Sequence, residues 1–435
     1  MRMFVIPTHR VCFEAIESFK TEIVYFQKET NEDAIFVLLD NGNTDNYQAN
    51  QKFLSNIEFP CPKYHISLKD MNSIARYISK KLGNDISQLL MPYEVDYGKI
   101  FNYIYIIGIL FKVSGIHRRD SDCQLLTLNM QNMPICMETR FLGQSVFKAR
   151  NDLSVDEQID YSLDEKVYMV GSGYLGDWDL DMKAIVEKNP DALKYLMKIC
   201  NIEESVIADE YNKKYGNSDE HITESLPILT SIFDTSHALE CGNTSLTEIY
   251  NYIPNFIGKN GVGFDYHTNF VAFECKVPMV YHYNKIYHIH DKFRHHDIKP
   301  LNYWKGIIKM VDFDNYHYSM ITHNDFTKMC NGKYGIDTIK RISNKILPDI
   351  LQYRFEKLER NKRIQNIDEI THKILMESHI SEYEQIGKCL DLEKEKILLE
   401  LDEEYAHSIE LQRKWSDIVE VIRDTDPTVY LRPVP

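Results

Sequence analysis

The sequence predicts an α/β fold: a mostly parallel sheet with flanking helices, followed by a helical region at the carboxyl end. In the first third, apolar runs that suit buried strands alternate with stretches of helical spacing. The apolar runs are Met3–Ile6, Ala34–Asp40 and Lys63–Leu68, and the helical stretches are residues 11–28, 44–55 and 69–82. A repeated strand–helix order is typical of parallel strands joined by crossover helices. In such sheets ligands bind beyond the carboxyl ends of the strands.

The middle of the chain is less regular. Ile100–Val113 is the most apolar run, but a membrane span needs about 20 apolar residues, so we expect a buried helix and no integral membrane segment. Two loops rich in glycine and aspartate follow, Gly171–Asp181 and Gly258–Phe270. The alternation within Val277–His290 predicts one or two strands with a turn at Tyr283–Lys285.

The last part of the chain has the pattern of a long helix. Between Glu382 and Arg423 there is no proline, and Gly387 is the only glycine. Apolar side chains recur there near helical spacing, with Glu and Lys between them: Ile397, Leu401, Tyr405, Ile409 and Ile418. This predicts an amphipathic helix that packs on the body of the protein or joins two copies into a homodimer.

The composition limits the kinds of partner. The 435 residues carry a net charge of −15, which disfavours general binding to nucleic acid or to an anionic membrane. An anionic substrate must therefore be met by local cations or by a metal ion. Nine cysteines without a C-x-x-C pair, and no apolar signal-peptide core at the amino end, predict reduced thiols and a cytoplasmic protein.

The segment GIHRRDSDCQL contains the strongest candidate for a metal site. Asp120 and Asp122 alternate on an extended segment, so both carboxylates point the same way and can share one divalent cation. Mg²⁺ and Mn²⁺ prefer such oxygen ligands and also bind diphosphates, and Arg118 and Arg119 can meet phosphate oxygens. Five D-x-D triplets occur, starting at 120, 177, 179, 312 and 424, and a solvated turn explains most of them. The triplet at 120 differs because it follows the strand–helix repeat and the apolar helix.

These motifs, in this order, resemble the opening of GT-A-fold glycosyltransferases related to family 2. The resemblance is carried by Ile6-Pro7-Thr8-His9-Arg10 at the end of the first strand, FVLLDNGNTDN (Phe36–Asn46) at the end of the second, and the later D-x-D. It covers about the first 125 residues and, more loosely, residues 258–290. It implies a Rossmann-like GT-A sheet that holds a nucleotide diphosphate sugar, with UDP as the expected nucleotide and Mn²⁺ or Mg²⁺ as cofactor. Residues 1–170 would form the nucleotide-sugar half, 171–300 the half that binds the acceptor and completes the metal site, and 301–435 the helical region.

The resemblance assigns roles to matching positions in the first half. Thr8 and Arg10 would line the nucleotide pocket, Asp40 would accept a hydrogen bond from the base, Asp120 would contact ribose or metal, and Asp122 would bind the metal. Where the family often has an arginine, Phe101 stands here, and Lys99 would supply the charge. The family has an apolar strand before its D-x-D, but here the residues are Ile116-His117-Arg118-Arg119. We therefore expect a strand that is short, at an edge, or turned with its polar side chains to the pocket.

In the second half, Asp265 follows a glycine-rich loop and would deprotonate the acceptor hydroxyl in an inverting reaction. His288 or His290 would complete the metal site, and Lys292 and Arg294 would neutralise the leaving diphosphate. A rival acidic cluster lies in GDWDLD: Trp178 would stack on a sugar, Asp179 would bind the acceptor, and Asp177 is a second candidate for the base.

Four classes of protein compete for this pattern. The first is a metal-dependent glycosyltransferase with an unidentified hydroxyl acceptor. The second is a sugar-1-phosphate nucleotidyltransferase, which PTHR disfavours because those enzymes carry a glycine-rich, arginine-containing loop there. The third is a catalytically degenerate relative that binds nucleotides or assembles with other proteins. The fourth is a histidine-based metallohydrolase centred on His288–Asp291, which lacks a clear partner motif.

Overall fold

The computed structural model describes residues 1–93, 95–125, 133–155, 161–176, 182–202, 226–231, 239–289, 300–322 and 334–435. Its amino-terminal part is the predicted repeat of strands and helices. The strands are β1 (Arg2–Thr8), β2 (Ala34–Asp40), β3 (Lys63–Ser67) and β4 (Gly115–Arg119), and the helices between them are α1 (Phe13–Thr30), α2 (Thr44–Asn56), α3 (Leu68–Leu82), α4 (Ser87–Leu90) and α5 (Tyr97–Leu110). These four strands are parallel, which confirms the predicted α/β class.

The large sheet has nine strands in the order β3-β2-β1-β4-β10-β7-β11-β9-β6. The additional strands are β6 (Ser154–Val155), β7 (Met169–Gly171), β9 (Ile228–Thr230), β10 (Asn243–Leu246) and β11 (Met279–Tyr281). β10 is antiparallel to both β4 and β7, and β9 is antiparallel to β11, whereas the other pairs are parallel. The sheet is therefore mostly parallel, with antiparallel pairs only in its second half.

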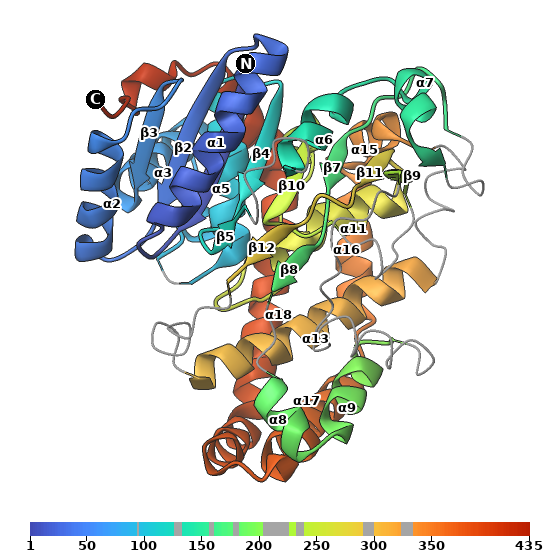
Figure 1. Cartoon of the computed structure of the whole chain (residues 1–435). Helices are drawn as coiled ribbons and strands as arrows, with labels where there is room; N and C mark the ends of the chain where they lie inside the picture. The colour runs from blue at the N-terminus through green and yellow to red at the C-terminus, as the bar shows by residue number, and fades with distance from the viewer. Residues whose placement is uncertain are drawn as a thin grey trace.

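A second, three-stranded sheet lies beyond the carboxyl ends of β1 and β4 (Figure 1). Its strands are β5 (Cys123–Gln124), β12 (Ile286–His288) and β8 (Tyr174–Gly176). β5 follows the D-x-D segment directly, and His288 pairs with Cys123 in the backbone ladder. Strands β11 and β12 are separated by the turn expected at Tyr283–Lys285, so that prediction is confirmed. The small sheet thus brings the D-x-D segment and the predicted histidine together.

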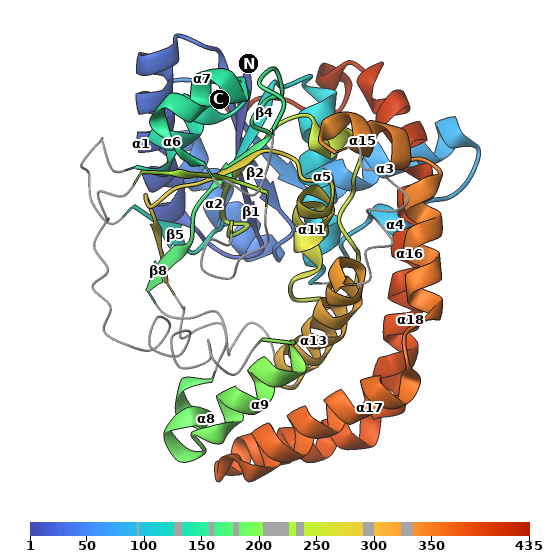
Figure 2. The ribbon, with the colours of Figure 1, turned by 90° about the vertical axis from the view of Figure 1, so that its right-hand side faces the viewer.

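Helices cover both sheets and form the carboxyl-terminal region. They are α6 (Pro134–Phe141), α7 (Val146–Ala149), α8 (Lys183–Lys188), α9 (Asp191–Ile199), α11 (His267–Glu274), α13 (Pro300–Thr322), α15 (Ile336–Ile342), α16 (Ile346–Glu356), α17 (Arg360–Asp368), a π-helical segment (Glu369–Leu375) and α18 (Ser381–Arg423). Figure 2 shows α16, α17 and α18 along one side of the molecule, beside α3 and α13. The helical character expected after residue 300 is confirmed for the described residues.

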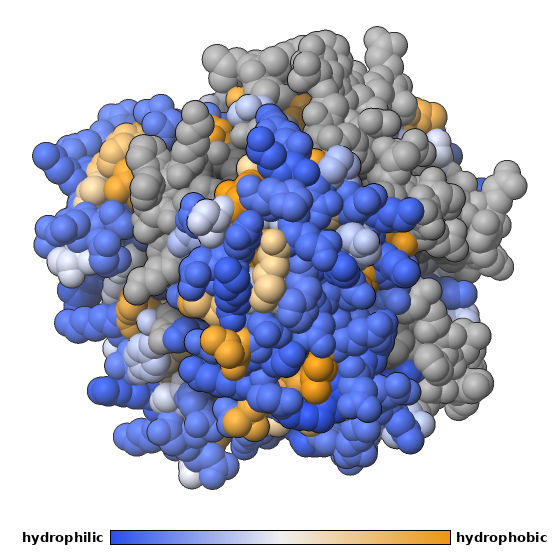
Figure 3. All heavy atoms as spheres, turned by 90° about the horizontal axis from the view of Figure 1, so that it is seen from below, coloured by the Kyte–Doolittle hydropathy of each residue, from blue (hydrophilic) through white to orange (hydrophobic). Residues whose placement is uncertain are grey.

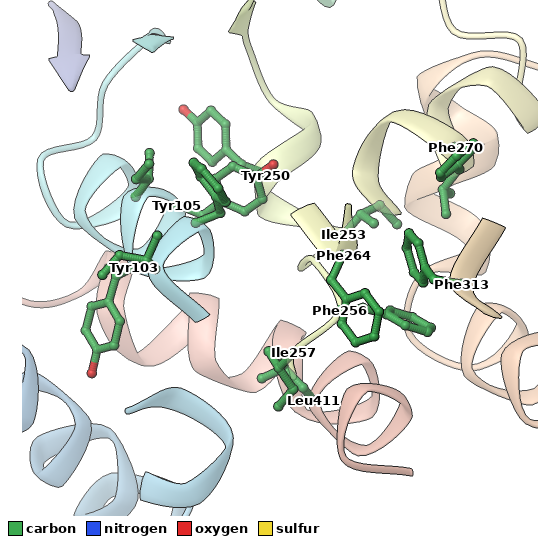
Figure 4. Packing of buried hydrophobic residues seen from close by; sticks show 14 of the residues in the cluster. Tyr103, Tyr105, Tyr250, Ile253, Phe256, Ile257, Phe264, Phe270, Phe313 and Leu411 are labelled. Atoms are coloured by element: carbon green, nitrogen blue, oxygen red, sulfur yellow. The ribbon is translucent and has the colours of Figure 1, made fainter. Parts of the chain in front are cut away.

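Helix α18 closes the main core of the molecule. Its predicted apolar stripe, from Ile397 to Ile418, is buried, and the helix packs on α3 and α5 as well as on α13, α16 and α17. Figure 4 shows Leu411 of α18 beside Ile257, with Phe256 close by. The ring of Phe256 lies 5.5 Å from that of Phe313, centre to centre. The expectation that the amphipathic helix packs on the body is therefore confirmed.

Helix α5 is buried along nearly its whole length, as its apolar sequence predicts. Its second residue, Gly98, touches the chain at Phe256, where an added Cβ would lie 1.5 Å from the backbone oxygen. Only glycine permits this close approach. Within the described residues, no helix has the length and apolar character that crossing a membrane requires.

The division into three parts stays a prediction. β7 contains the boundary expected between residues 170 and 171, and the large sheet combines strands from both sides of it.

Candidate functional site

A cavity of about 150 Å³ opens at the carboxyl ends of β1 and β4, where a parallel sheet is expected to bind ligands. Six of the residues that the sequence singled out for catalysis, nucleotide binding or metal binding line it: Thr8, Arg10, Asp120, Asp122, Asp265 and His288. They come from the end of β1 and the residues just after it, from the segment after β4, from the turn before α11 and from β12. Residues up to 280 positions apart in the chain therefore share one pocket.

Strand β4 carries its polar side chains in the middle of the sheet. It is short, as expected, but it lies between β1 and β10 and is not an edge strand. Side chains alternate along a strand, so Arg118 faces the pocket while His117 and Arg119 face α1 and α6. There Arg119 pairs with Glu22 at 2.7 Å and with Glu138 at 2.8 Å. Buried counter-charges thus permit a polar strand at this position.

Arg118 joins two of the pocket acids. Its Nε and Nη2 donate to Oδ1 of Asp120 at 3.1 and 2.8 Å, and Nη2 lies 3.5 Å from Oδ2 of Asp265. The guanidinium lies over the ring of Phe101, 3.1 Å from the ring centre. Phe101 stands at the position where the resembled family often has an arginine, and the structure fills the adjacent space with Arg118 instead.

A second charged group surrounds Asp122. Its Oδ1 lies 3.3 Å from Nε2 of His288, and its Oδ2 lies 3.5 Å from a guanidinium nitrogen of Arg10. The ring of His288 stacks on that of Tyr174 at 4.7 Å. Tyr174 also donates its hydroxyl hydrogen to Oδ2 of Asp120 at 3.1 Å, so it connects the two carboxylates of the D-x-D.

Asp265 sits in a 3₁₀ turn (Phe264–Tyr266) that leads into α11. The preceding Gly263 has a φ of 81°, in the left-handed region that glycine adopts without strain. Burial raises the pKa of the Asp265 carboxyl above its usual value, and Arg118 opposes that effect. Once ionised, such a carboxylate is a stronger base than an exposed one.

The predicted metal ligands fit a cation only in part. Asp122 and His288 face one another, but both oxygens of Asp120 already accept hydrogen bonds, from Arg118 and from Tyr174. Among the described residues, a mutually close set of three ligand atoms, all within 4.8 Å, occurs only at Asp368, His372 and Asp391. That set lies far along the chain, between α17 and α18, and its two aspartates already bind the ammonium of Lys394 at 2.8 and 3.0 Å.

Two predicted nucleotide-binding residues lie outside the cavity lining. Asp40 is buried and accepts hydrogen bonds from the Gly42 amide, Asn50 and His65 at 2.8, 2.9 and 3.0 Å. It therefore fixes the turn after β2, and its neighbour Asn41 lines the pocket. Lys99 lies in the first turn of α5, 3.6 Å from Asp96.

Part of the predicted site lies outside the described residues. This applies to Asp177, Trp178 and Asp179 of the rival acidic cluster and to His290, Lys292 and Arg294.

Sequence reasoning missed Asp96 and Tyr174, which line the pocket, and Gly242, which lies behind Tyr174 and Asp120. Asp96 caps α5 by accepting from the Lys99 amide at 2.9 Å, and burial raises its pKa to about 6 against the opposing effect of Lys99. An acid just before an apolar helix is a visible capping signal. Tyr174, and Gly242, whose amide donates to the Tyr174 hydroxyl at 2.7 Å, had no such signal. An added Cβ at Gly242 would lie 2.3 Å from Asp120, so glycine is needed there.

The fold and the pocket define the class: an α/β protein with a charged pocket at the carboxyl ends of its parallel strands. The chain belongs to a family of unknown function, DUF6271, whose model matches residues 3–430. Among curated proteins, none matches the chain.

Proposed function

We propose that this protein is a GT-A-type glycosyltransferase that moves a sugar from a nucleotide diphosphate sugar, expected to be UDP-linked, to a hydroxyl acceptor. The observation that carries the proposal is the convergence of three separate motifs on one pocket. The PTHR segment lies at the end of β1, the D-x-D follows β4, and Asp265 lies in the turn before α11. All three line the same cavity. The resemblance to family 2 had matched these motifs by their order in the sequence alone.

The proposed chemistry uses residues that face the cavity. Asp265 accepts the proton of the acceptor hydroxyl, whose oxygen forms a bond to the anomeric carbon of the sugar. The bond from that carbon to the diphosphate oxygen breaks, and its electron pair leaves with the diphosphate. Arg10 and Arg118 meet the leaving group, because guanidinium groups bind phosphate oxygens in a bidentate manner. Attack from the face opposite the leaving group inverts the configuration at the anomeric carbon.

The proposal includes a divalent cation, Mn²⁺ or Mg²⁺. Asp122 and His288 are the described residues that would hold it, with Asp120 contributing if Arg118 releases that carboxylate. Such a cation stabilises the negative charge that develops on the leaving diphosphate. A cytoplasmic location and a homodimer through the carboxyl-terminal helices also belong to the proposal.

One observation favours a second candidate function, a degenerate nucleotide-binding protein. Arg118 ties up both Asp120 and Asp265. If these contacts persist with ligand bound, the Asp265 carboxylate stays paired with a guanidinium, which weakens it as a base, and the pocket binds without turnover.

The test combines ligand binding and donor hydrolysis. A panel of nucleotides and nucleotide sugars is screened by thermal shift and calorimetry with and without Mn²⁺, and slow donor hydrolysis is followed by nucleotide release. The variants are Asp122→Asn and the matched control Asp424→Asn, an exposed aspartate in another D-x-D triplet.

We expect one donor to stabilise the wild type and the control, and both stabilisation and hydrolysis to fall in Asp122→Asn. If a donor binds but is not turned over, even with a range of acceptors present, the result favours the degenerate nucleotide-binding protein. No binding by any nucleotide refutes both functions.

A further inference from the structure

We propose that Arg118 couples the binding of the diphosphate to the binding of the divalent cation, by moving its guanidinium from Asp120 to the diphosphate. This inference rests on the proposed function and deepens it. It assigns Arg118 the role of a positioning residue that makes the two ligands bind cooperatively.

Arg118 is held in place and cannot simply turn into solvent. Its side chain is 9% exposed, its guanidinium is stacked on Phe101, and its backbone lies in the middle of the nine-stranded sheet. If Arg118 lost Asp120, its buried guanidinium would keep only the more distant Asp265, and a poorly compensated buried charge is strongly unfavourable. Arg118 will therefore leave Asp120 only when another anion replaces that carboxylate.

A divalent cation that arrives alone meets an Asp120 whose carboxylate is already bound. Both oxygens of Asp120 are engaged, one by Arg118 and the other by the Tyr174 hydroxyl, which is itself fixed by the Gly242 amide. A cation that arrives alone must take Asp120 away from Arg118 and leave the guanidinium facing Asp265 only, at 3.5 Å. The cation alone is thus expected to bind weakly.

A diphosphate that arrives alone meets a pocket lined by more aspartates than arginines. Four acids line the cavity, Asp96, Asp120, Asp122 and Asp265, and the described arginines that line it are Arg10 and Arg118. Arg10 contacts Asp122, and Arg118 contacts both Asp120 and Asp265. A diphosphate that arrives alone must compete with carboxylates for both arginines and meets a surplus of negative charge. It too is expected to bind weakly by itself.

Together the two ligands remove both obstacles. The cation takes Asp120 and the diphosphate takes Arg118, so each buried charge keeps a partner of the opposite sign. Coupling between two ligands is reciprocal, so each should raise the affinity of the other by the same factor. We expect this factor to be about tenfold or more, within the usual range of such couplings.

The experiment measures binding, not activity. Mn²⁺ binding is followed by the loss of its free electron paramagnetic resonance signal, and UDP binding by calorimetry, each with and without the other ligand. Inorganic pyrophosphate serves as a probe that lacks the base. The variants are Arg118→Met, Asp120→Asn and the control Arg140→Met, which removes an arginine that is paired with Asp152 and half exposed at the surface.

The two site variants should shift single-ligand binding in opposite directions. Arg118→Met frees Asp120, so Mn²⁺ alone should bind more tightly than in the wild type. Asp120→Asn frees Arg118, so UDP or pyrophosphate alone should bind more tightly. In both variants the coupling factor should fall below about threefold, while Arg140→Met should keep the wild-type factor.

The coupling proposal is overturned if Arg118→Met keeps the wild-type factor or binds Mn²⁺ no more tightly. If Arg118→Met does not fold, Asp120→Asn decides by the same measurements. If wild-type protein binds neither UDP nor pyrophosphate, with or without Mn²⁺, the proposed function itself fails. Binding of UDP with no coupling leaves the proposed function standing and refutes the role of Arg118.

Discussion

Replacement of Arg119 by methionine should lower the free energy of unfolding by about 3–5 kcal/mol, the usual cost of breaking a buried ion pair from one side. The Arg119 side chain is 1% exposed and those of its two acidic partners are fully buried. Nε and Nη2 hold both oxygens of Glu22 at 2.9 and 2.7 Å, and Nη1 lies 2.8 Å from Glu138. Without the guanidinium, the carboxylates of Glu22 and Glu138 remain close together in the core. His117, which is hydrogen-bonded to Glu138, is then left to balance their charge.

The assay is thermal unfolding at neutral pH, with Arg140→Met as the matched control. Arg140 makes one contact of 2.8 Å with Asp152, but both side chains are about half exposed, and such pairs contribute less than about 1 kcal/mol. For a chain of this length that unfolds in one step, 3–5 kcal/mol corresponds to about 3–6 °C in the midpoint, and the control should shift by about 1 °C or less.

A triple variant separates the cost of the uncompensated charges from the cost of lost side-chain packing. Arg119→Met combined with Glu22→Gln and Glu138→Gln removes the uncompensated charges, so it should recover part of the loss. The reasoning is refuted if Arg119→Met and Arg140→Met shift the midpoint equally, or if the triple variant is less stable than Arg119→Met.

Three further predictions concern α5, the pocket and α18. Gly98→Ala should cost about 1–3 kcal/mol or more in thermal unfolding, since its Cβ collides with the Phe256 backbone, and an unchanged midpoint would contradict the close contact. Burial raises the pKa of Asp96 from 3.8 to about 6, so wild-type stability should fall by up to about 3 kcal/mol as pH rises from about 4 to 6 and then level off. Asp96→Asn should lack that slope in urea unfolding measured across this range, and equal slopes would refute the assignment. Leu392 and Leu399 of α18 are 86% and 59% exposed. If they lie in a homodimer interface, the double variant Leu392→Glu, Leu399→Glu should sediment as a monomer. A dimer mass that stays unchanged excludes this part of α18 as the interface.

One face of the molecule is largely polar over its described residues. On the face seen from below in Figure 3, the described residues are mostly hydrophilic, with separate small apolar spots. Leu392 and Leu399 are the exposed large apolar side chains on the described α18, so their replacement tests a dimer through that helix directly.

The sequence predicted the first three strands and α5 well because their signals are local. Strands of a parallel sheet are buried on both faces, so each is visible in the sequence as a short apolar run between turn residues. β2 accordingly matches its predicted bounds, Ala34–Asp40. Strand β4 could be placed only in part, because its polar residues depend on counter-charges from elsewhere. Glu22, for example, lies 97 positions before Arg119.

The same limit applies to the candidate site. Asp120, Asp122 and Asp265 were found from motifs, and the structure brings them into one pocket. The resemblance to family 2 placed Asp40 at the nucleotide base, but in the structure Asn50 and His65 both bind its Oδ2 oxygen and hold the turn after β2. Tyr174 comes near Asp120 only through pairing of β8 with β12, which no sequence spacing indicates.

The position of α18 has a consequence for synthesis of the chain. Its side chains cover α3 and α5, yet α5 ends at Leu110 and α18 begins only at Ser381. A ribosome adds about 5–20 residues per second, so roughly 15–50 seconds pass between synthesis of α5 and the start of α18. Until then the apolar face of α3 and α5 that α18 buries stays exposed. During this interval the nascent chain presents a surface suited to chaperones, and a stop codon before α18 would leave it exposed permanently.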